Sequence, residues 1–281
     1  MSPDYELSIE DTTQIYDPAT DTWTTGAQNP NATSSGGSAV LDGKLYVVGG
    51  TTATSQPLTT VSVYDPSTNT WGTAASYPEP IADEACAAVT GKLYCAGGVN
   101  AAGGNEPTDA FAYDPAKNSW KRIASLPISL ATSASGSADG RFLISGGFTG
   151  ADATVTNQGF AYDPAMDWWT PLPNAPVARF WATGAMGFYV VGGLQDVFAG
   201  KNLPTVSRLT GYDQSGPVRL PWLSTDRTTL TIQPGCQVTV RVRLDARQSG
   251  LSGPGTDSGV FEFETDSPYA VGAVPVSMTV R

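Results

Sequence analysis

A unit of about 49 residues recurs along the 281-residue chain, and this repeat constrains the fold more strongly than any single motif. Each copy carries a Tyr-Asp-Pro segment, a Trp seven residues after the Tyr, and a pair of adjacent glycines. A fixed period in this range indicates a solenoid or a propeller. Four copies agree: the tyrosines are Tyr16, Tyr64, Tyr113 and Tyr162, the tryptophans are Trp23, Trp71, Trp120 and Trp169, and the paired glycines are Gly49-Gly50, Gly97-Gly98, Gly146-Gly147 and Gly192-Gly193.

Within one copy the pattern predicts four short strands. Residues 36–41 are small and apolar, Asp42-Gly43 is a tight hairpin signal, and residues 44–48 are β-branched and aromatic. The paired glycines allow positive φ where this second strand ends. Residues 59–65 form a third strand that ends at an Asp-Pro turn, and the fourth strand carries Trp71. Four strands with short links form one propeller blade.

The double glycine that closes one strand, followed by a spaced Tyr and Trp, resembles the kelch repeat over residues 5–213. The resemblance implies an all-β fold with a kelch-type β-propeller at residues 1–216, in which the Tyr and Trp of each copy lie in the core between blades. We expect about five blades. The first is incomplete, with its second and third strands at 5–10 and 12–17 and no innermost strand; three complete blades follow, and a decayed fifth runs from about 180 to 222.

Residues 217–281 lack the repeat and are expected to form a small Ig-like β-sandwich. Alternating residues predict strands at 228–232, 237–244, 259–265 and 273–280, separated in part by a Gly-rich loop at 249–259. The residues expected to face inward on the second of these strands are Val238, Val240, Val242 and Leu244, and those expected to face outward are Thr239, Arg241 and Arg243. If this strand pairs with the third, the arginines and Glu262 and Glu264 could form cross-strand ladders.

The start of this second domain adds another resemblance. Its Trp222-Leu223-Ser224 segment, Gln233-Pro234-Gly235 turn and Val-Thr-Val strand are similar to modules that follow kelch repeats in secreted bacterial subtilisin-like proteases. The resemblance implies an accessory C-terminal region of an extracellular or cell-surface protein. No protease motif lies in the sequence itself.

The absence of histidine from the sequence excludes many kinds of catalytic site. His general bases, Ser-His-Asp and Cys-His pairs, and nearly all catalytic zinc and copper sites need this residue. We expect no cofactor and no metal. The net charge of −11 and the pI near 4.3 argue against nucleic acid and an anionic membrane as partners. Because the N-terminal residues do not form a signal peptide and begin inside a repeat, we expect a mature or excised part of a longer protein.

The links between strands divide into two classes. The first-to-second and third-to-fourth links are tight, whereas the second-to-third links and the links between blades are long and irregular. Alternating strand direction places all the long links on one face, and loops on a rigid scaffold usually carry the binding site. The candidate ligand-binding residues on this face are Arg179, Trp181, Asp83, Glu84, Asp196 and Lys201.

Two features of this set leave alternatives open. Arg179 lies at an inter-blade position where many kelch repeats carry Arg; its equivalents are expected at Thr33, Asp83 and Leu130, so a ring of like residues is absent. It either contacts a ligand together with Trp181 or is a structural residue bonded to loop carbonyls. The adjacent carboxylates Asp83 and Glu84 could act as an acid/base pair or bind a cation with Asp196, but neighbours on a strand point to opposite faces.

Cys86 and Cys95 flank the two-residue turn Thr90-Gly91, which places them directly opposite each other in the predicted hairpin. Such a pair can form a disulfide, which an exported protein would retain, or can serve as two small core residues. Mass measurement with and without reductant distinguishes these states. Cys236 has no evident partner.

These observations predict a non-catalytic binding or spacer module of a secreted, bacterial multidomain protein, with a protein or a carbohydrate as ligand. The alternative is a kelch-type sugar-modifying enzyme such as a sialic-acid epimerase, for which Arg179 and Glu84 are the available catalytic pair. Galactose oxidase-type copper enzymes share the domain order but need His ligands. An intracellular kelch adaptor is disfavoured by the acidic composition and by the absence of a BTB-like region.

Overall fold

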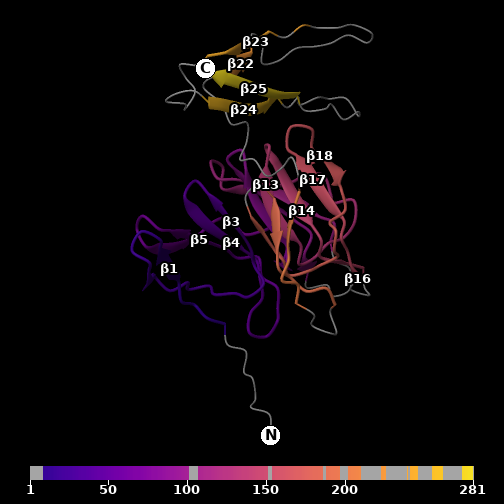
Figure 1. The fold of residues 1–281 in the computed structure, drawn as a ribbon. Helices are drawn as coiled ribbons and strands as arrows, with labels where there is room; N and C mark the ends of the chain where they lie inside the picture. Colours follow the sequence, from indigo (N-terminus) through magenta and orange to yellow (C-terminus); the bar gives the residue numbers. More distant parts are fainter. Residues whose placement is uncertain are drawn as a thin grey trace. The chain divides into compact units, whose positions relative to one another are not determined.

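The computed structural model describes residues 9–100, 107–150, 154–185, 188–196, 202–209, 223–225, 239, 241–245, 255–261 and 274–280. The chain divides into two compact units, Met1–Gly216 and Pro217–Arg281. All the regular secondary structure in the described part is β-strand (Figure 1). None of the described residues forms a helix long and apolar enough to cross a membrane.

Three four-stranded antiparallel sheets, each in chain order from the innermost strand outward, form the complete blades of the first unit. A three-stranded sheet follows them, and a two-stranded hairpin precedes them. The first complete blade contains β3 (Gly37–Leu41), β4 (Lys44–Val48), β5 (Val61–Asp65) and β6 (Thr70–Thr73); the second contains β8 (Ala85–Val89), β9 (Lys92–Ala96), β11 (Ala110–Asp114) and β12 (Ser119–Arg122); the third contains β13 (Ala134–Ala138), β14 (Arg141–Ser145), β17 (Gly159–Asp163) and β18 (Trp168–Leu172).

The remaining strands of this unit are shorter. The hairpin consists of β1 (Gln14–Asp17) and β2 (Thr22–Thr25), and the three-stranded sheet of β19 (Thr183–Ala185), β20 (Tyr189–Val191) and β21 (Val206–Arg208). Two small ladders join the irregular links: β7 (Ile81–Ala82) with β10 (Val99–Asn100), and β15 (Phe148–Thr149) with β16 (Thr154–Val155).

The predicted all-β kelch-type propeller is confirmed, with about four blades. The strand expected at residues 5–10 falls mainly outside the described residues, and its last two residues are not in a strand. The next expected strand, at 12–17, is observed as β1. Of the expected fifth blade, the strands β19–β21 are present, and residues 210–222 lie outside the described part.

The paired glycines clamp each blade to the next. All four pairs have positive φ, as expected. In the first three pairs the second glycine donates its N–H to the inter-blade link, for example Gly98 to the Leu130 carbonyl at 2.8 Å. The first glycine makes room for the same carbonyl, because a Cβ built on Gly97 would lie 2.2 Å from the Leu130 oxygen. Glycine is therefore required here by a close approach as well as by its backbone conformation.

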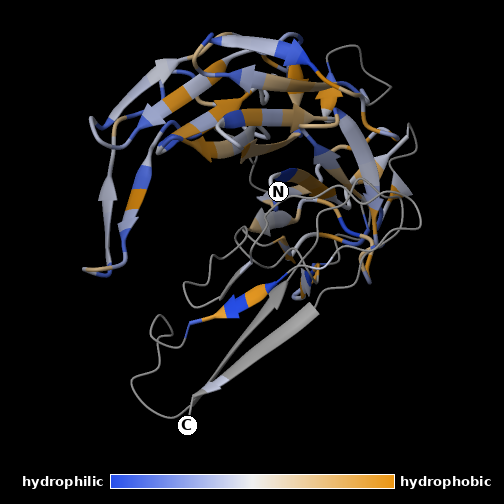
Figure 2. Ribbon diagram, turned by 90° about the horizontal axis from the view of Figure 1, so that it is seen from above, coloured by the Kyte–Doolittle hydropathy of each residue, from blue (hydrophilic) through white to orange (hydrophobic). Residues whose placement is uncertain are grey.

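The strands of the first unit carry hydrophobic residues, coloured orange along the ribbon in Figure 2. The buried hydrophobic side chains of the described residues form three clusters, each between successive sheets. The predicted inter-blade role of Tyr and Trp holds in the complete blades, where Tyr64, Tyr113 and Tyr162 are buried. Each blade's indole also donates to a carbonyl in the link that follows the last strand of the preceding sheet. The pairs are Trp71 to Ala27 at 3.0 Å, Trp120 to Ala75 at 2.9 Å and Trp169 to Ala124 at 2.7 Å.

The N-terminal hairpin has the same residues in the same local arrangement but in a different environment. Tyr16 and Trp23 are cross-strand partners with ring centroids 5.1 Å apart, as in the complete blades. Their side chains are 44% and 67% exposed. The motif thus specifies its own hairpin, whereas its burial depends on a neighbouring sheet.

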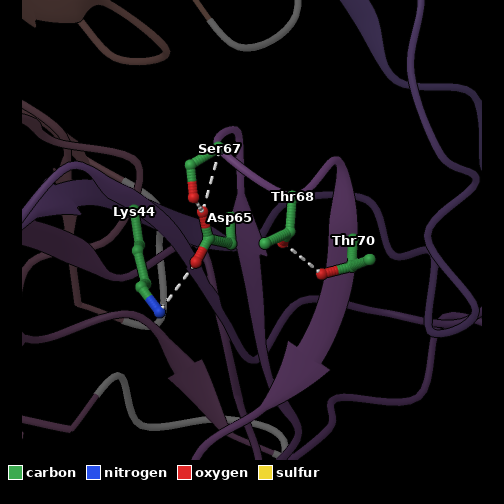
Figure 3. A network of polar contacts seen from close by, with 5 residues as sticks. All are labelled: Lys44, Asp65, Ser67, Thr68 and Thr70. Atoms are coloured by element: carbon green, nitrogen blue, oxygen red, sulfur yellow. Dashed lines mark hydrogen bonds and ion pairs between the residues drawn. The ribbon is translucent and has the colours of Figure 1, made fainter.

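The Asp-Pro turns close the outer pair of strands through side-chain hydrogen bonds, as predicted. In the first complete blade, one oxygen of Asp65 accepts from both the backbone and the hydroxyl of Ser67, and the other forms a 2.9 Å ion pair with Lys44 (Figure 3). Thr68 and Thr70 are hydrogen-bonded across the same turn. These bonds lower the pKa of Asp65 to about 2, with the Ser67 hydroxyl as the largest cause.

The second unit contains two described hairpins. β22 (Leu223–Thr225) pairs with β23 (Val242–Leu244), and β24 (Gly255–Phe261) pairs with β25 (Val274–Val280). Three expectations need correction: residues 255–259 belong to a strand instead of a loop, the described partner of β23 is β22 instead of the third predicted strand, and Val242 and Leu244 are exposed. Residues 228–232, with Val238, Val240, Glu262 and Glu264, lie outside the described residues.

Candidate functional site

The irregular links of the propeller meet on one side of the blades. Leu58, from a second-to-third link, bridges Ile81 in the link that leads to the next blade. The same link also contains β7, which pairs with β10 in the second-to-third link of the next blade. The long links therefore interleave, as the alternation of strand direction required.

At the inner end of these links, four residues occupy equivalent positions just before the innermost strands β3, β8, β13 and β19. They share a left-handed backbone, with φ values between 50° and 58°. Backbone hydrogen bonds join them in sequence, at distances of 2.7, 2.9 and 3.0 Å, from the N–H of each residue to the carbonyl of its predecessor. We call these residues the mouth ring: Ser35, Asp83, Thr132 and Trp181.

Two adjoining recesses lie at and below the mouth ring. The mouth recess, of about 270 Å³, is lined by all four ring residues and by the residues that follow them. The inner recess, of about 290 Å³, lies along the innermost strands of four successive sheets. Glu84 lines both. The inner recess is lined by Gly36, Gly37, Ser38, Glu84, Cys86, Ser133, Ser135, Ala182, Thr183 and Gly184.

Glu84 is the buried titratable group of this site, with 5% of its surface exposed. Its Oε1 accepts a 3.0 Å hydrogen bond from the backbone N–H of Gly37 on the neighbouring blade. Its Oε2 is buried and has no hydrogen-bond partner among the described residues. Burial raises the pKa of Glu84 to about 8, the Asp83 charge adds to this increase, and backbone N–H groups oppose it. At neutral pH this carboxyl holds a proton in a polar recess.

Asp83 and Trp181 lie on the mouth ring itself. Partial burial raises the pKa of Asp83, while hydrogen bonds from Ser35 and Trp181 oppose the increase. The Trp181 side chain is 62% exposed, although its ring packs against buried Phe180 at a centroid distance of 5.1 Å. Phe180 in turn packs edge-on against Phe148. The exposed indole is therefore held from behind by an aromatic stack.

Arg179 lies outside this group. It is 1% exposed, and its guanidinium donates to the carbonyls of Gly192 and Thr205 and to the hydroxyls of Thr205 and Ser207, at 3.0–3.1 Å. These groups flank β20 and β21 of the next sheet. Burial lowers the pKa of Arg179. Of the two predicted alternatives, this geometry corresponds to the structural arginine.

The predicted equivalents of Arg179 also need correction. The carbonyls of Ile81, Leu130 and Arg179 each accept from the second glycine of a pair, so Ile81 is the equivalent residue and Asp83 is not. Asp83 is instead equivalent to Trp181. The prediction was correct for Leu130 and was two residues out of register at Asp83, which lies in a link without periodicity.

The other predicted site residues are dispersed. Asp196 is exposed and lines neither recess. Lys201 lies outside the described residues. Within the described ranges no group of three or more Cys, Asp or Glu residues is arranged to hold a metal ion. The structure thus brings together Asp83, Glu84 and Trp181 from the predicted set.

Sequence reasoning missed Ser35, Thr132, Ser133 and Ser135, because a small polar residue at a strand end resembles an ordinary turn residue. A positional signal was available for part of the ring. Counting fourteen residues back from the first glycine of each pair finds Ser35, Asp83 and Thr132.

Cys86 and Cys95 face each other across β8 and β9, directly opposite in register, as expected from the two-residue turn. They are joined by a disulfide, with their Cα atoms 4.2 Å apart. Both are buried, and Cys86 lines the inner recess. Cys236 lies outside the described residues.

The comparisons with known proteins concern the propeller. No curated protein matches the chain. A solved structure described as "Structure of YjhT" is similar with a TM-score of 0.53 and 21% sequence identity, covering 68% of this chain and 74% of that chain. This likeness concerns the fold alone. The family described as the KLHDC2/KLHL20/DRC7 Kelch-repeats domain matches residues 4–196, which is more than half of the sequence. The chain therefore belongs to this family of kelch-repeat domains.

Proposed function

We propose that the chain is a non-catalytic binding module whose ligand site is the mouth ring with the two recesses below it, and that the ligand is a carbohydrate. The observation that carries this proposal is Trp181. A large aromatic residue in a left-handed backbone conformation costs about 1–3 kcal/mol, and such strain clusters at ligand sites. Folding does not repay this cost by burying the indole, because it remains 62% exposed.

The surroundings of Trp181 fit a sugar ring. An immobilised aromatic face provides contact area at little entropic cost, and the aromatic stack behind the indole limits its movement. Hydroxyl, carboxyl and backbone groups of the recesses can bond sugar hydroxyls. The recesses, at about 270 and 290 Å³, lie near the lower end of small-molecule sites, which suits one sugar unit better than a long polymer.

We further propose that the module belongs to a secreted multidomain protein, as an accessory region with a fifth blade and an Ig-like C-terminal domain. The disulfide between Cys86 and Cys95 is consistent with an oxidising compartment. The match to the kelch-repeat family and the two C-terminal hairpins support an all-β architecture, which is the coarser part of this proposal.

The test is a panel of mono- and disaccharides, titrated by ligand-observed NMR against the wild type and two variants. Trp181→Ala is expected to weaken binding by about tenfold or more, because it removes the exposed face. Trp168→Ala is the matched control: Trp168 is 64% exposed but lies on β18, the outermost strand of its blade. Equal affinities of both variants and the wild type for every bound sugar would refute this site.

A second candidate function is a sugar-modifying enzyme, such as a sialic-acid epimerase. Glu84 favours it, because a carboxyl whose pKa is raised to about 8 holds a transferable proton at neutral pH. The lining of the site argues against an anionic sugar, since within the described part of the chain neither recess is lined by Lys or Arg. Incubation with N-acetylneuraminate, followed by NMR, tests the idea; no anomer or epimer exchange eliminates it.

A further inference from the structure

The inner recess contains a buried carboxyl oxygen without a partner. Glu84 Oε2 is shielded from solvent, and no described group donates to it, while Oε1 is bonded to Gly37. A buried polar atom without a partner destabilises a fold by about 1–3 kcal/mol, so its presence in a recess calls for an explanation. A ligand that donates a hydrogen bond into the recess would supply the missing partner.

Two of the hydroxyls that line this recess, those of Ser133 and Ser135, already donate their protons within the protein. Ser133 Oγ donates to the Gly146 carbonyl at 2.8 Å, and Ser135 Oγ donates to the Cys86 carbonyl at 2.8 Å. Each hydroxyl has one proton to donate, so these two oxygens retain only lone pairs. Together with Oε2 of Glu84 in its ionised form, the recess therefore presents three acceptors. A suitable ligand group must bring several donors.

The charge of the site points in the same direction. Asp83 and Glu84 are the two ionisable side chains among the described residues that line the recesses, since Cys86 is in the disulfide. Buried Tyr77, which interacts with Glu84, keeps its proton because burial raises its pKa well above the ordinary value. The net charge of the side chains that line the recesses is therefore zero or negative, which favours a cation over an anion as ligand.

We infer that the inner recess binds the primary ammonium group of an amino sugar, which donates to Glu84 Oε2 and to the Ser133 and Ser135 hydroxyl oxygens while Trp181 covers the sugar ring. An ammonium group has three donors and no acceptor, which matches the acceptors of the recess. A sugar hydroxyl offers one donor, and a carboxylate offers none. This inference rests on the proposed carbohydrate-binding function and specifies the chemical class of its ligand.

Ammonium binding has a consequence that a neutral sugar lacks. The charged ligand stabilises the ionised form of Glu84, which in the free protein is largely protonated at pH 7. Binding therefore releases up to one proton per site near pH 7. Calorimetric titration in two buffers of different ionisation enthalpy measures this release directly.

The experiment compares three methyl glucosides that differ only at C2, with an amino, an acetamido or a hydroxyl group, at pH 7. The wild type is expected to bind the amino glucoside at least about tenfold more tightly than the other two, because a charge-assisted hydrogen bond is stronger than a neutral one. Glu84→Gln is expected to abolish this preference and the proton release. Glu79→Gln, the matched control, should retain both.

Glu79 suits this purpose because it too has a buried oxygen without a partner, yet it lines neither recess. Equal affinity of the wild type for all three glucosides would overturn the inference and leave the proposed function intact. Failure of all three to bind, together with the rest of the sugar panel, would overturn both. If Glu84→Gln does not fold, proton release by the wild type with the amino glucoside, and its absence with the hydroxyl compound, decides the question.

Discussion

The two ends of each blade differ in what recurs from one repeat to the next: side chains at one end, and backbone conformation at the other. At the end with the tight turns, the side chains recur: a Tyr, an Asp before Pro, an Asn or Asp that accepts from the Tyr hydroxyl, and a Trp that donates to the link after the preceding sheet. At the end with the long links, the backbone and the paired glycines recur, whereas the side chains of the mouth ring do not. The mouth ring has one conformation and one hydrogen-bond pattern but consists of Ser, Asp, Thr and Trp.

Because of this difference, the side chains that can contact a ligand at the mouth ring are not the groups that hold the blades together there. Bonds between backbone groups do not depend on which side chain is attached, so the mouth can change its chemistry without losing its connection between blades. The turn end has no such freedom, because its connections between blades pass through the indole of the Trp and the side-chain oxygen of the Asn or Asp. Substitutions at the two ends should therefore have different consequences.

The largest effect is expected from the glycine clamp at the mouth end. Gly97→Ala places a Cβ 2.2 Å from the Leu130 carbonyl oxygen in a left-handed conformation, so we expect a loss of at least about 4 kcal/mol from strain and displacement of the next blade. Gly91→Ala at the turn end has a similar φ of 77° but open space, and should lose only about 1–2 kcal/mol. Urea denaturation measures both; equal losses would show that the clamp adds nothing.

The second effect concerns the pH dependence contributed by Glu84. Its folded pKa of about 8 lies above its ordinary value of 4.5, so its contribution to stability is complete below pH 4.5 and is lost as pH rises through 8. Relative to Glu84→Gln, the wild type should lose about 4 kcal/mol between pH 5 and pH 9, and about 5 kcal/mol at most. Urea denaturation at both pH values tests this. Parallel stability curves for the two proteins would contradict the burial of this carboxyl.

A smaller effect is expected at the turn end, where Trp169→Phe keeps an aromatic ring but removes the donor to the Ala124 carbonyl. The unpaired carbonyl should cost about 1–2 kcal/mol in thermal or urea unfolding. Trp23→Phe, on the exposed hairpin, should change stability by less than about 0.5 kcal/mol. A loss at Trp23 as large as that at Trp169 would mean that the hairpin is covered in solution.

The smallest effect concerns the exposed ion pair at the Asp-Pro turn of the first complete blade. Lys44→Ala should raise the pKa of Asp65 from about 2 part of the way toward its ordinary value, because the Ser67 bonds remain. Carboxyl NMR titration of Asp65 measures this shift. A pKa unchanged in the variant would assign the whole depression to Ser67.

The repeat made the blades predictable because each strand, hairpin turn and glycine pair is encoded locally and four times over. The direct opposition of Cys86 and Cys95 followed in the same way from a two-residue turn. The environment of Glu84 did not, since its burial depends on Gly37, which lies 47 residues away on another blade. Arg179 was misjudged for a related reason: its partners belong to the next sheet, and the irregular links give no periodicity by which to align them.

The second domain shows the same limit more strongly. Alternation located part of β23 and β25, but it did not determine which strands pair, because pairing is decided by contacts between distant residues. Gly255–Phe261 begins in a glycine-rich stretch that composition alone assigns to a loop. In the propeller, four concordant copies compensated for this weakness.

The disulfide beneath Glu84 has a consequence for the history of each molecule. Its two sulfurs belong to residues that are 3% and 0% exposed, and thiol–disulfide exchange requires a thiolate to reach one of them. Once the blades have packed, the bond borders, within the described part of the chain, only the inner recess, of about 290 Å³, which is too small to admit a protein reductant. The oxidation state of this cysteine pair in the folded chain is thus determined by the redox potential of the compartment in which the chain folded. Molecules isolated from a native source would retain this oxidation state even after moving to a compartment of different redox potential.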